Sequence, residues 1–451
     1  MTVLLFATII VAVVLMVLAI SKLKMHPFIV LILISLIVGL FWGIVDPESG
    51  LNPTGVVNQV KSGFGSIMTS IGIVILCGTI IGTILEKTGA ALTMANAILK
   101  LVGQKNSVVA MGAMGYVTGI PVFCDSGFVV LSPISRALAQ QSNISLAVMG
   151  TALSGGLYAT HCLVPPTPGP IAMAGTLEAD LGLTILVGLC ISIPATLVAI
   201  LYAKKVASKV NIPANSEYTL EELQQKYGKL PGTLQSFAPI LLPIILIGLA
   251  SVTDFPSKPF GEGIVYQIIM FLGNPVVALL IGVFLAISLI PKTEKKNTLA
   301  WVTQGVTDSA GILAITCAGS SFGAILKCMP IASSVGSLVN SGLGVFIPFI
   351  IAMILKLAMG ASTVAMITTA GMMAPLLEPM GFTSPLARVI IVLAIGAGSM
   401  VASHANDSYF WVVSQFSDMK TEEAYKCQTG MTAVMGITVI IVLFVLSLFV
   451  R

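Results

Sequence analysis

The stretch Ala159-Thr-His-Cys-Leu-Val-Pro-Pro-Thr-Pro-Gly-Pro170 interrupts an apolar segment with four prolines in six residues. Each proline removes a backbone donor and clashes with the preceding helical turn, so no continuous helix accommodates this stretch. The second half of the chain contains a polar counterpart, Ala402-Ser-His-Ala-Asn-Asp-Ser408, again between apolar residues. These two stretches predict two broken helices, one in each half.

The rest of the chain is strongly apolar. Of its 451 residues, 56% are hydrophobic and 9% are charged, whereas soluble domains carry about 25% charged residues. A spanning helix needs about 20 mainly apolar residues. Runs of this kind recur at 2–20, 27–45, 182–203, 238–253, 264–290 and 430–450. They are too uniformly apolar for the alternating strands of a membrane barrel, so we predict an all-α polytopic membrane protein.

Three pairs of segments indicate an internal repeat. The glycine-containing segments GTIIGTIL (78–85) and GSSFGAIL (319–326) match at an offset of 241 residues. Gly119 and Gly360 are paired at the same offset, each in a polar interruption. Further on, the segment that ends at His161 aligns with the segment that ends at His404, at an offset of 243. An offset that is nearly constant over three blocks predicts a duplicated architecture.

Lysine-rich stretches indicate how the two halves are oriented. Lysines cluster at 22–24, 204–209 and 292–296. The positive-inside bias places all three stretches in the cytoplasm, so the first helix runs inward and the helix at 238–253 runs outward. We therefore predict inverted-topology repeats at 1–203 and 238–451, joined by a cytoplasmic linker at 204–237.

Two further interruptions predict re-entrant hairpins. Gly119-Ile-Pro-Val-Phe-Cys-Asp-Ser-Gly127 divides an apolar segment into parts that are too short to span a bilayer, and Gly360-Ala-Ser-Thr363 does the same in the second half. Non-helical backbone at membrane depth is tolerated only where it is buried in protein or lines a cavity. We expect both hairpin tips and both broken helices to meet around one substrate pocket near the midplane.

The interruptions also supply the candidate site residues. A helix that restarts inside the membrane points free N–H groups and a positive dipole end at the cavity, which favours an anion without a buried arginine. The candidates for binding a carboxylate and hydroxyl groups are Ser126, Thr160, Thr167, Ser362, Thr363, Ser403 and Asn406.

Ionisable groups inside the membrane are costly and usually functional. Asp125 and Asp407 are therefore the first candidates for proton coupling, followed by His161 and His404. A lone histidine in a helical bundle is also a common structural residue, and that alternative stays open for both. Of the other charges near the breaks, Glu86 and Lys327 are interpreted as boundary or structural charges. Arg136 and Arg388 flank the interruptions and are interpreted as candidate cytoplasmic or interfacial anchors.

Several function classes are disfavoured. The net charge of +4 is dispersed and forms no basic stripe of the kind that binds nucleic acid. The seven cysteines show no paired metal-type spacing, so no metal and no cofactor are expected. HExxH and nucleotide-binding motifs do not occur in the sequence, which argues against an enzyme. A channel remains as a competing class, although it would favour a continuous polar-lined helix over paired interruptions.

Three motifs resemble the gluconate permease family, which also contains permeases for D-serine and related hydroxy acids. They are ATHCLVPPTPGP (159–170), PVFCDSGFVVLSP (121–133) and SHANDSYFW (403–411). The resemblance covers essentially the whole chain. It implies a proton symporter for gluconate-like acids, in a superfamily of anion transporters that have inverted repeats and re-entrant hairpins. These transporters are usually homodimers that move by an elevator-type mechanism.

From the residues and the resemblance together, we expect a secondary active transporter that imports a small hydroxylated monocarboxylate by proton symport. Gluconate or a related sugar acid is the expected substrate, and the expected location is a bacterial inner membrane. The alternatives are a permease for D-serine or glycerate, or a sodium-coupled carboxylate transporter. The expected partners are an organic anion, a proton, the lipid bilayer and a second copy of the chain.

Overall fold

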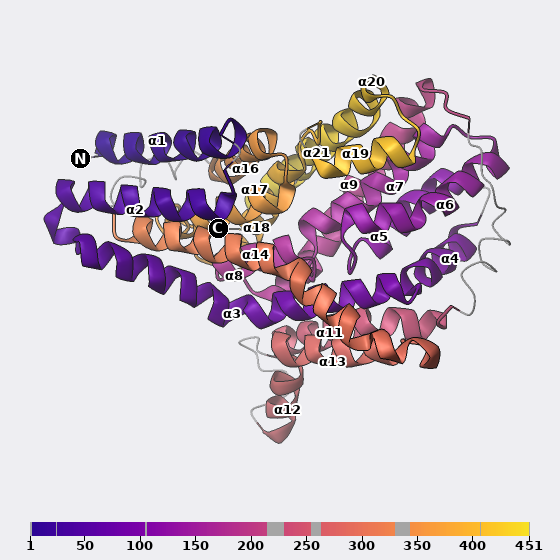
Figure 1. The fold of residues 1–451 in the computed structure, drawn as a ribbon, viewed down its shortest axis with the longest axis horizontal. Helices are drawn as coiled ribbons and strands as arrows, with labels where there is room; N and C mark the ends of the chain where they lie inside the picture. The colour runs from indigo at the N-terminus through magenta and orange to yellow at the C-terminus, as the bar shows by residue number, and fades with distance from the viewer. Residues whose placement is uncertain are drawn as a thin grey trace.

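A computed structural model describes residues 2–23, 25–103, 106–213, 230–253, 263–329, 343–405 and 407–450. Within these ranges the regular elements are helical throughout (Figure 1). Six of the described helices are long and apolar enough to cross a membrane, or up to eight if each of two bent pairs is one span. Residues 214–229 of the predicted linker and the candidate site residue Asn406 lie outside the described residues.

The first half begins with two apolar helices and then enters its repeat. Its helices are α1 (Thr2–Ser21), α2 (Pro27–Val45), α3 (Pro53–Lys87), α4 (Ala90–Val102), α5 (Ser107–Thr118), α6 (Cys124–Ser142), α7 (Leu146–Leu163), α8 (Pro168–Thr176) and α9 (Leu181–Lys205). Helices α5 and α6 form the first hairpin, and α7 and α8 form the first broken helix.

The second half follows the same order. Its helices are α11 (Thr233–Thr253), α12 (Ile264–Leu272), α13 (Pro275–Ser288), α14 (Thr298–Lys327), α16 (Phe346–Met359), α17 (Ser362–Met373), α18 (Pro385–Met400), α19 (Ser408–Phe416), α20 (Thr421–Ala424) and α21 (Gly430–Ser447). Short 3₁₀ turns lie at η1 (Pro47–Ser49), η3 (Ala207–Lys209), η4 (Lys292–Asn297), η6 (Leu343–Val345) and η7 (Ala374–Leu376), and a π-helix, η8 (Tyr425–Thr429), precedes α21. Helices α16 and α17 form the second hairpin, and α18 and α19 the second broken helix.

The two broken helices run in opposite directions. At one end, Gly150 near the start of α7 lies against Ser417 just after α19, and a Cβ on Gly150 would lie 2.1 Å from the Ser417 hydroxyl oxygen. At the other end, Arg388 near the start of α18 donates to the carbonyl of Leu177 just after α8, at 3.1 Å. The predicted fold class is therefore confirmed: two inverted repeats, each with a hairpin and a broken helix.

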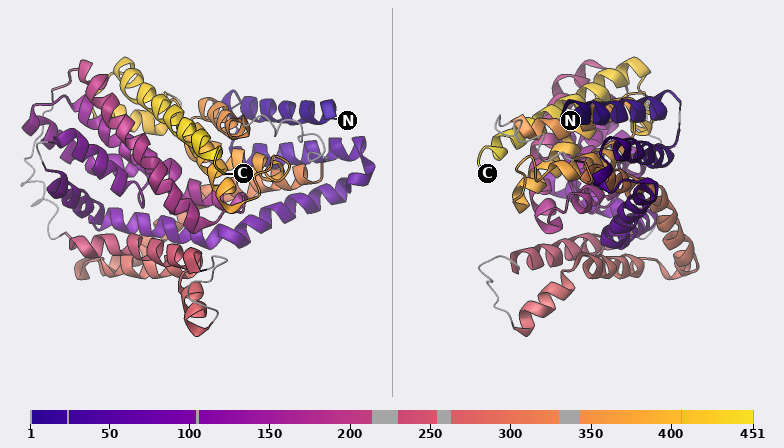
Figure 2. Two further views of the ribbon diagram at one scale, coloured as in Figure 1. Left: turned by 180° about the vertical axis from the view of Figure 1, so that it is seen from behind. Right: turned by 90° about the vertical axis from the view of Figure 1, so that its left-hand side faces the viewer.

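One group of helices forms a framework beside the repeats' interrupted segments. Helices α3 and α14 run side by side across the molecule, with α11 and α13 beneath them (Figure 1). Small residues allow the close approach of α3 and α14: a Cβ on Gly63 would lie 2.7 Å from the carbonyl oxygen of Ser320. Helix α12, which has no buried residue, projects from the body (Figure 2).

The interrupted segments make up the most buried part of the molecule. All 18 residues of α7 are buried, and α18 is buried along most of its length. A helix that is apolar on every side belongs inside a protein or in lipid, and here protein surrounds both helices. Outer helices instead present apolar stripes, such as Ile193, Leu197 and Leu201 on α9. The breaks in α7 and α18 are consequently held at the centre of the fold.

Candidate functional site

Four helices begin at the four predicted interruptions. They are α6, which begins at Cys124, α8 at Pro168, α17 at Ser362 and α19 at Ser408. The starts of α8 and α17 touch: a Cβ on Gly169 would lie 2.4 Å from the Met366 methyl carbon and 3.8 Å from a Thr363 methyl carbon. Helix α19 in turn packs on α6. The fold therefore gathers four helix N-termini at the centre of the interrupted segments.

Three of these four starts have no side-chain cap. The N-cap residues of α6, α8 and α17 make no side-chain cap hydrogen bond. By contrast, the neighbouring helices α7, α9 and α18 are capped by Ser145, Asp180 and Ser384, respectively. The first N–H groups of a helix lack intrahelical partners and seek a side chain, water or ligand. The uncapped starts leave such donors available to an anion.

A buried ion pair connects the second hairpin to the second break. Lys356, in α16, is 0% exposed, and its Nζ lies 2.5 Å from Asp407 Oδ2. The same Nζ donates to the Gly360 carbonyl at the hairpin tip, at 2.5 Å. Two buried charges are stable only when they are paired and hydrogen-bonded, and this geometry provides both.

Asp407 is held from several directions. It is the N-cap of α19, where its Oδ1 accepts from the Tyr409 backbone N–H at 3.2 Å. The Ser403 hydroxyl donates to its Oδ2 at 2.6 Å. The peptide of Ser403 is fixed in turn, because its N–H donates to Thr432 and its carbonyl accepts from Thr429. Thr429 is the last residue of the π-helix η8, a type of element that often occurs at functional sites.

Asp125 brings a second carboxylate to the ion pair. It lies in the first turn of α6, at the tip of the first hairpin, and interacts electrostatically with Asp407 and Lys356. Its Oδ1 is buried and has no hydrogen-bond partner. Two carboxylates around one ammonium leave one negative charge in excess when all three groups are ionised. The cluster therefore has a place for one proton or one monovalent cation.

The two histidines occupy different environments. His161 lies in the last turn of α7, is 4% exposed and stacks on Tyr158, with ring centroids 6.4 Å apart. Its Nδ1 is buried without a partner, and the ring interacts electrostatically with Asp407 and Lys356. His404 lies beyond the end of α18, is partly exposed, and its Nε2 lies 3.2 Å from the Leu357 carbonyl. Only His161 sits inside the buried cluster, although the sequence pairs the two.

The candidate hydroxyl residues are spread around this cluster. Ser362 is buried beside Tyr158 and Cys162, and Ser126 follows Asp125 in α6. Thr160 donates to the Leu157 carbonyl at 3.3 Å, and Thr167 donates to the Val164 carbonyl at 2.6 Å. The two threonine protons are thus used by local backbone, while their oxygens keep acceptor capacity.

Lys356 is the site residue that the sequence analysis did not identify. It is a lone lysine inside the apolar segment FIPFIIAMILKLAM (346–359). An ionisable residue in such a segment is a functional candidate by default, so the signal was present in the sequence. Tyr158 and Tyr409 were also missed; they stack with centroids 5.3 Å apart and form an aromatic wall beside the ion pair.

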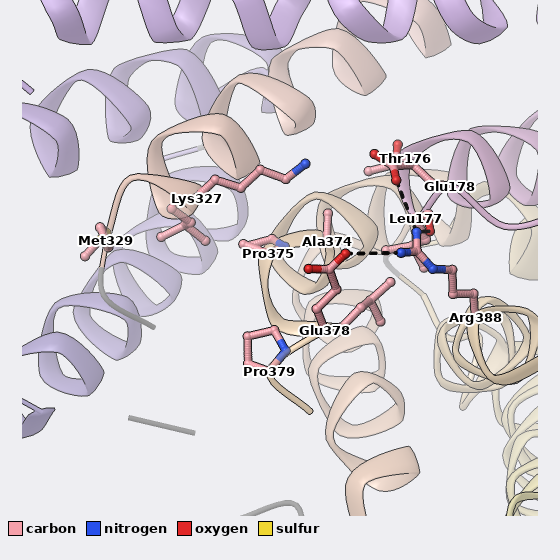
Figure 3. Close-up of a pocket in the computed structure, with 12 residues that line it drawn as sticks. Thr176, Leu177, Glu178, Lys327, Met329, Ala374, Pro375, Glu378, Pro379 and Arg388 are labelled. Carbon is pink, nitrogen blue, oxygen red and sulfur yellow. Dashed lines mark hydrogen bonds and ion pairs between the residues drawn. The ribbon is translucent and has the colours of Figure 1, made fainter. Parts of the chain in front are cut away.

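Two hollows lie about one helix length from the cluster. The larger, of about 550 Å³, is lined at the ends of α8, α14 and α17 by residues that include Thr176, Lys327 and Glu378 (Figure 3). A second hollow, of about 490 Å³, shares Thr176 and Lys327 with it. Helix α17 has 12 residues, which is about 18 Å at the usual rise. The hollows and the cluster therefore lie at opposite ends of α8 and α17, and the ion pair is closed to both.

Reciprocal ion pairs tie the two repeats together at opposite ends of the site. Glu178 after α8 and Asp418 after α19 both adopt φ of 52°. Arg388 of the second half contacts Glu178 at 3.2 Å and Glu378 at 3.5 Å (Figure 3). Arg136 of the first half donates to both carboxylate oxygens of Asp418, at 2.6 and 2.9 Å, and thereby lowers the pKa of that carboxyl. Both arginines thus pair with carboxylates of the other repeat.

A metal site is not evident in the part of the chain that the structure describes. There, no three His, Cys, Asp or Glu side chains group closely enough to hold a metal ion. The chemistry available at the centre is therefore that of two carboxylates, one ammonium, one imidazole and uncapped helix starts. Groups of this kind are chemically able to bind an anion and to exchange a proton.

Comparison with known proteins places this arrangement in a family. The model of the GntP family permease matches residues 3–449. An uncharacterised permease of Haemophilus influenzae is 36% identical over 90% of this chain and 84% of its own length. A gluconate permease of Pseudomonas aeruginosa is 30% identical, covering 95% and 94%, and the D-serine transporter DsdX of Escherichia coli is 31% identical, covering 98% of both chains.

A solved structure shares the fold. The crystal structure of the YdaH transporter of Alcanivorax borkumensis, described as having an unusual topology, superposes with a TM-score of 0.67. The superposition covers 94% of this chain and 99% of that chain, at 14% sequence identity. At this identity the likeness concerns the fold alone.

Proposed function

This chain belongs to the GntP family of permeases, and we propose that it imports a small hydroxylated monocarboxylate, gluconate or a related sugar acid, by proton symport. It is a multi-pass membrane protein and a secondary transporter of small organic acids. The proposal rests on one observation: Lys356, Asp407 and Asp125 meet where four helices begin. The excess negative charge there supplies the proton site, and the helix starts supply donors for the anion.

The proposed roles follow from the position of each residue. Asp125 and Asp407 titrate, and His161 and His404 are the next candidates for proton coupling. Residues at the hairpin tips and breaks hold the carboxylate and the substrate hydroxyls: Ser126, Thr160, Thr167, Ser362, Thr363, Ser403 and Asn406. No ATP-binding loop occurs in the sequence, so the energy of uptake comes from an ion gradient.

We further propose a homodimer in a bacterial inner membrane, with the linker at 204–237 in the cytoplasm. The framework of α3 and α14 would remain fixed, while the interrupted segments move as one body in an elevator-type motion. The ion pairs Arg136–Asp418 and Arg388–Glu178 support movement as one body, because they join the repeats on both sides of the site.

Two substrate alternatives remain within this function. D-serine or glycerate could replace a sugar acid, since relatives that are named for gluconate and for D-serine are equally similar to this chain. Sodium could replace the proton, since the cluster's excess charge suits either ion. Both alternatives are outcomes of the experiment that follows.

The test uses purified protein in liposomes that are loaded with potassium buffer and free of sodium. We expect an inward proton gradient to drive accumulation of labelled gluconate, and unlabelled gluconate inside to accelerate entry by counterflow. Asp125→Asn or Asp407→Asn should abolish accumulation, whereas Glu48→Gln, an exposed loop carboxylate, should not. Accumulation that needs sodium would overturn proton coupling, entry without counterflow would indicate a channel, and preference for D-serine or glycerate would replace the sugar acid.

A further inference from the structure

We propose that Lys356 is a counter-ion that passes from Asp407 to the transported carboxylate when Asp407 takes up a proton. The inference deepens the proposed function, because it assumes that an anion and a proton travel together. Lys356, in the second hairpin, would then bind substrate. The exchange of its partner would also explain why the proton and the carboxylate are transported together.

The first step concerns the N–H donors of the Lys356 ammonium group. Lys356 Nζ has three N–H donors, and two are used by Asp407 and Gly360, each at 2.5 Å. The described residues provide no third hydrogen-bond partner; the ammonium instead lies 5.9 Å from the centre of the Tyr158 ring. Lys356 can therefore contact an added oxygen without first losing both of its present partners.

The second step concerns charge. Besides Asp407, the titratable groups that face Lys356 come from two elements: Asp125 and Cys124 of α6, and Tyr158, His161 and Cys162 of α7. Tyr409 of α19 interacts with Asp407 and Asp125 instead. While Asp125 and Asp407 are both ionised, an incoming carboxylate meets an excess of negative charge and is repelled. Protonation of Asp407 removes that excess and breaks its ion pair with Lys356, so an incoming carboxylate can take the place of Asp407 beside the buried ammonium.

The third step concerns where the carboxylate would sit. The start of α17 carries no side-chain cap, and Ser362, its first residue, is buried beside Tyr158, the same ring that faces Lys356. The buried Nδ1 of His161, whose ring stacks on Tyr158, also lacks a partner. A carboxylate between Lys356 and the start of α17 would therefore receive an ion pair and free backbone donors together.

The charge count then explains coupling. In the empty state the pair consists of Lys356 and ionised Asp407; in the loaded state it consists of Lys356 and the substrate carboxylate, with the proton on Asp407. With Asp125 ionised, the cluster carries one excess negative charge in both states, whereas the anion without the proton would raise that excess to two. Proton and anion consequently favour each other's binding, and by linkage the effect is reciprocal.

The first experiment tests the exchange of the counter-ion without assuming any natural substrate. Formate is the probe, and the thermal unfolding of purified Asp407→Asn, wild type, Glu48→Gln and the double variant Lys356→Met/Asp407→Asn is followed as formate is added. Formate should raise the Tm of Asp407→Asn in proportion to the logarithm of its concentration, and leave the other three proteins nearly unchanged. If Asp407→Asn does not survive purification, its recovery should depend on formate in the buffer.

Equal formate effects on Asp407→Asn and the double variant would overturn the inference, as would failure of formate to recover an unstable Asp407→Asn. The second experiment titrates gluconate into wild type and Asp407→Asn in two buffers of different ionisation enthalpy. We expect about one proton taken up per anion by wild type and about none by Asp407→Asn, by linkage. Unchanged proton uptake in the variant contradicts the inference; a positive formate result without gluconate binding instead sinks the proposed substrate class alone.

Discussion

The break between α7 and α8 and the break between α18 and α19 occupy corresponding places in the two repeats, yet different interactions hold them. In the first, backbone packs against glycine: a Cβ on Gly78 of α3 would lie 2.9 Å from the Pro166 carbonyl oxygen. At the neighbouring hairpin tip, a Cβ on Gly82 would lie 2.5 Å from the Pro121 carbonyl oxygen. In the second break, Asp407 is held by Lys356 and Ser403.

The difference separates two tasks. Contacts between glycine and a carbonyl do not depend on pH or on a bound ion, so the packing of the first break and its hairpin is insensitive to the charge state of the site. The second break is held by groups that change charge, so its stability depends on what is bound. The duplicated architecture thus keeps its topology in both halves and concentrates the ion-pair chemistry in one. Four changes test this contrast.

The largest effect is expected for Lys356→Met. Removing one partner of a buried ion pair leaves the other charge uncompensated, at a cost of about 3–5 kcal/mol. The double variant Lys356→Met/Asp407→Asn should recover part of that loss, because it also removes the uncompensated charge of Asp407. Reversible unfolding in detergent measures both. A double variant that is less stable than Lys356→Met would show that the pair does not depend on charge compensation.

The second largest effect is expected from removing the hydroxyl groups of the two breaks, which should contribute differently to stability. Ser403→Ala removes a donor to a carboxylate, worth about 1.5–3 kcal/mol, whereas Thr167→Val removes a donor to a neutral carbonyl, worth about 0.5–1.5 kcal/mol. The same unfolding measurement compares them. If the Thr167 variant loses as much stability as the Ser403 variant, the contrast fails. The Thr167 hydroxyl would then contribute as much as a donor to a carboxylate.

A methyl group tests the packing at the first hairpin. Gly82→Ala places a carbon against the Pro121 carbonyl and should cost about 1–3 kcal/mol by overpacking. Gly65→Ala in the same helix is the matched control, because a Cβ there meets nothing within 4 Å. The control should be neutral or slightly stabilising, since alanine favours a helix. Equal stability of the two variants would show that the close contact between Gly82 and the Pro121 carbonyl does not stabilise this hairpin.

The smallest effect on stability is expected at the Arg136–Asp418 ion pair. Because Arg136 lowers the pKa of Asp418, the pair stabilises the fold at pH values above the ordinary aspartate range and ceases to do so as the pH falls through the lowered value. Arg136→Gln should therefore cost stability at pH 7 and nothing extra in strong acid. Asp418 is half exposed, so the cost should stay below about 1 kcal/mol and shrink with salt. A loss that is independent of pH and salt would assign Arg136 a packing role instead.

The sequence by itself determined the helical class, the membrane environment, the repeat and the places where helices break. These features follow from local properties: apolar length decides whether a helix spans, and a proline or a polar residue interrupts it wherever the segment lies. The sequence also pointed to Asp125 and Asp407, since a carboxylate within an apolar segment is costly in any membrane fold. It also contained the signal for Lys356, a lone lysine inside an apolar segment, although the sequence analysis did not single it out.

Only the tertiary structure decided which of these groups meet. Lys356 and Asp407 are 51 residues apart and lie on different elements, so their ion pair depends on how the second hairpin packs against the second broken helix. The same packing separates His161, inside α7, from His404, beyond α18, although a repeat alignment pairs them. Spacing along a chain specifies neighbours within one helix, whereas burial and charge pairing between helices are set by the whole fold.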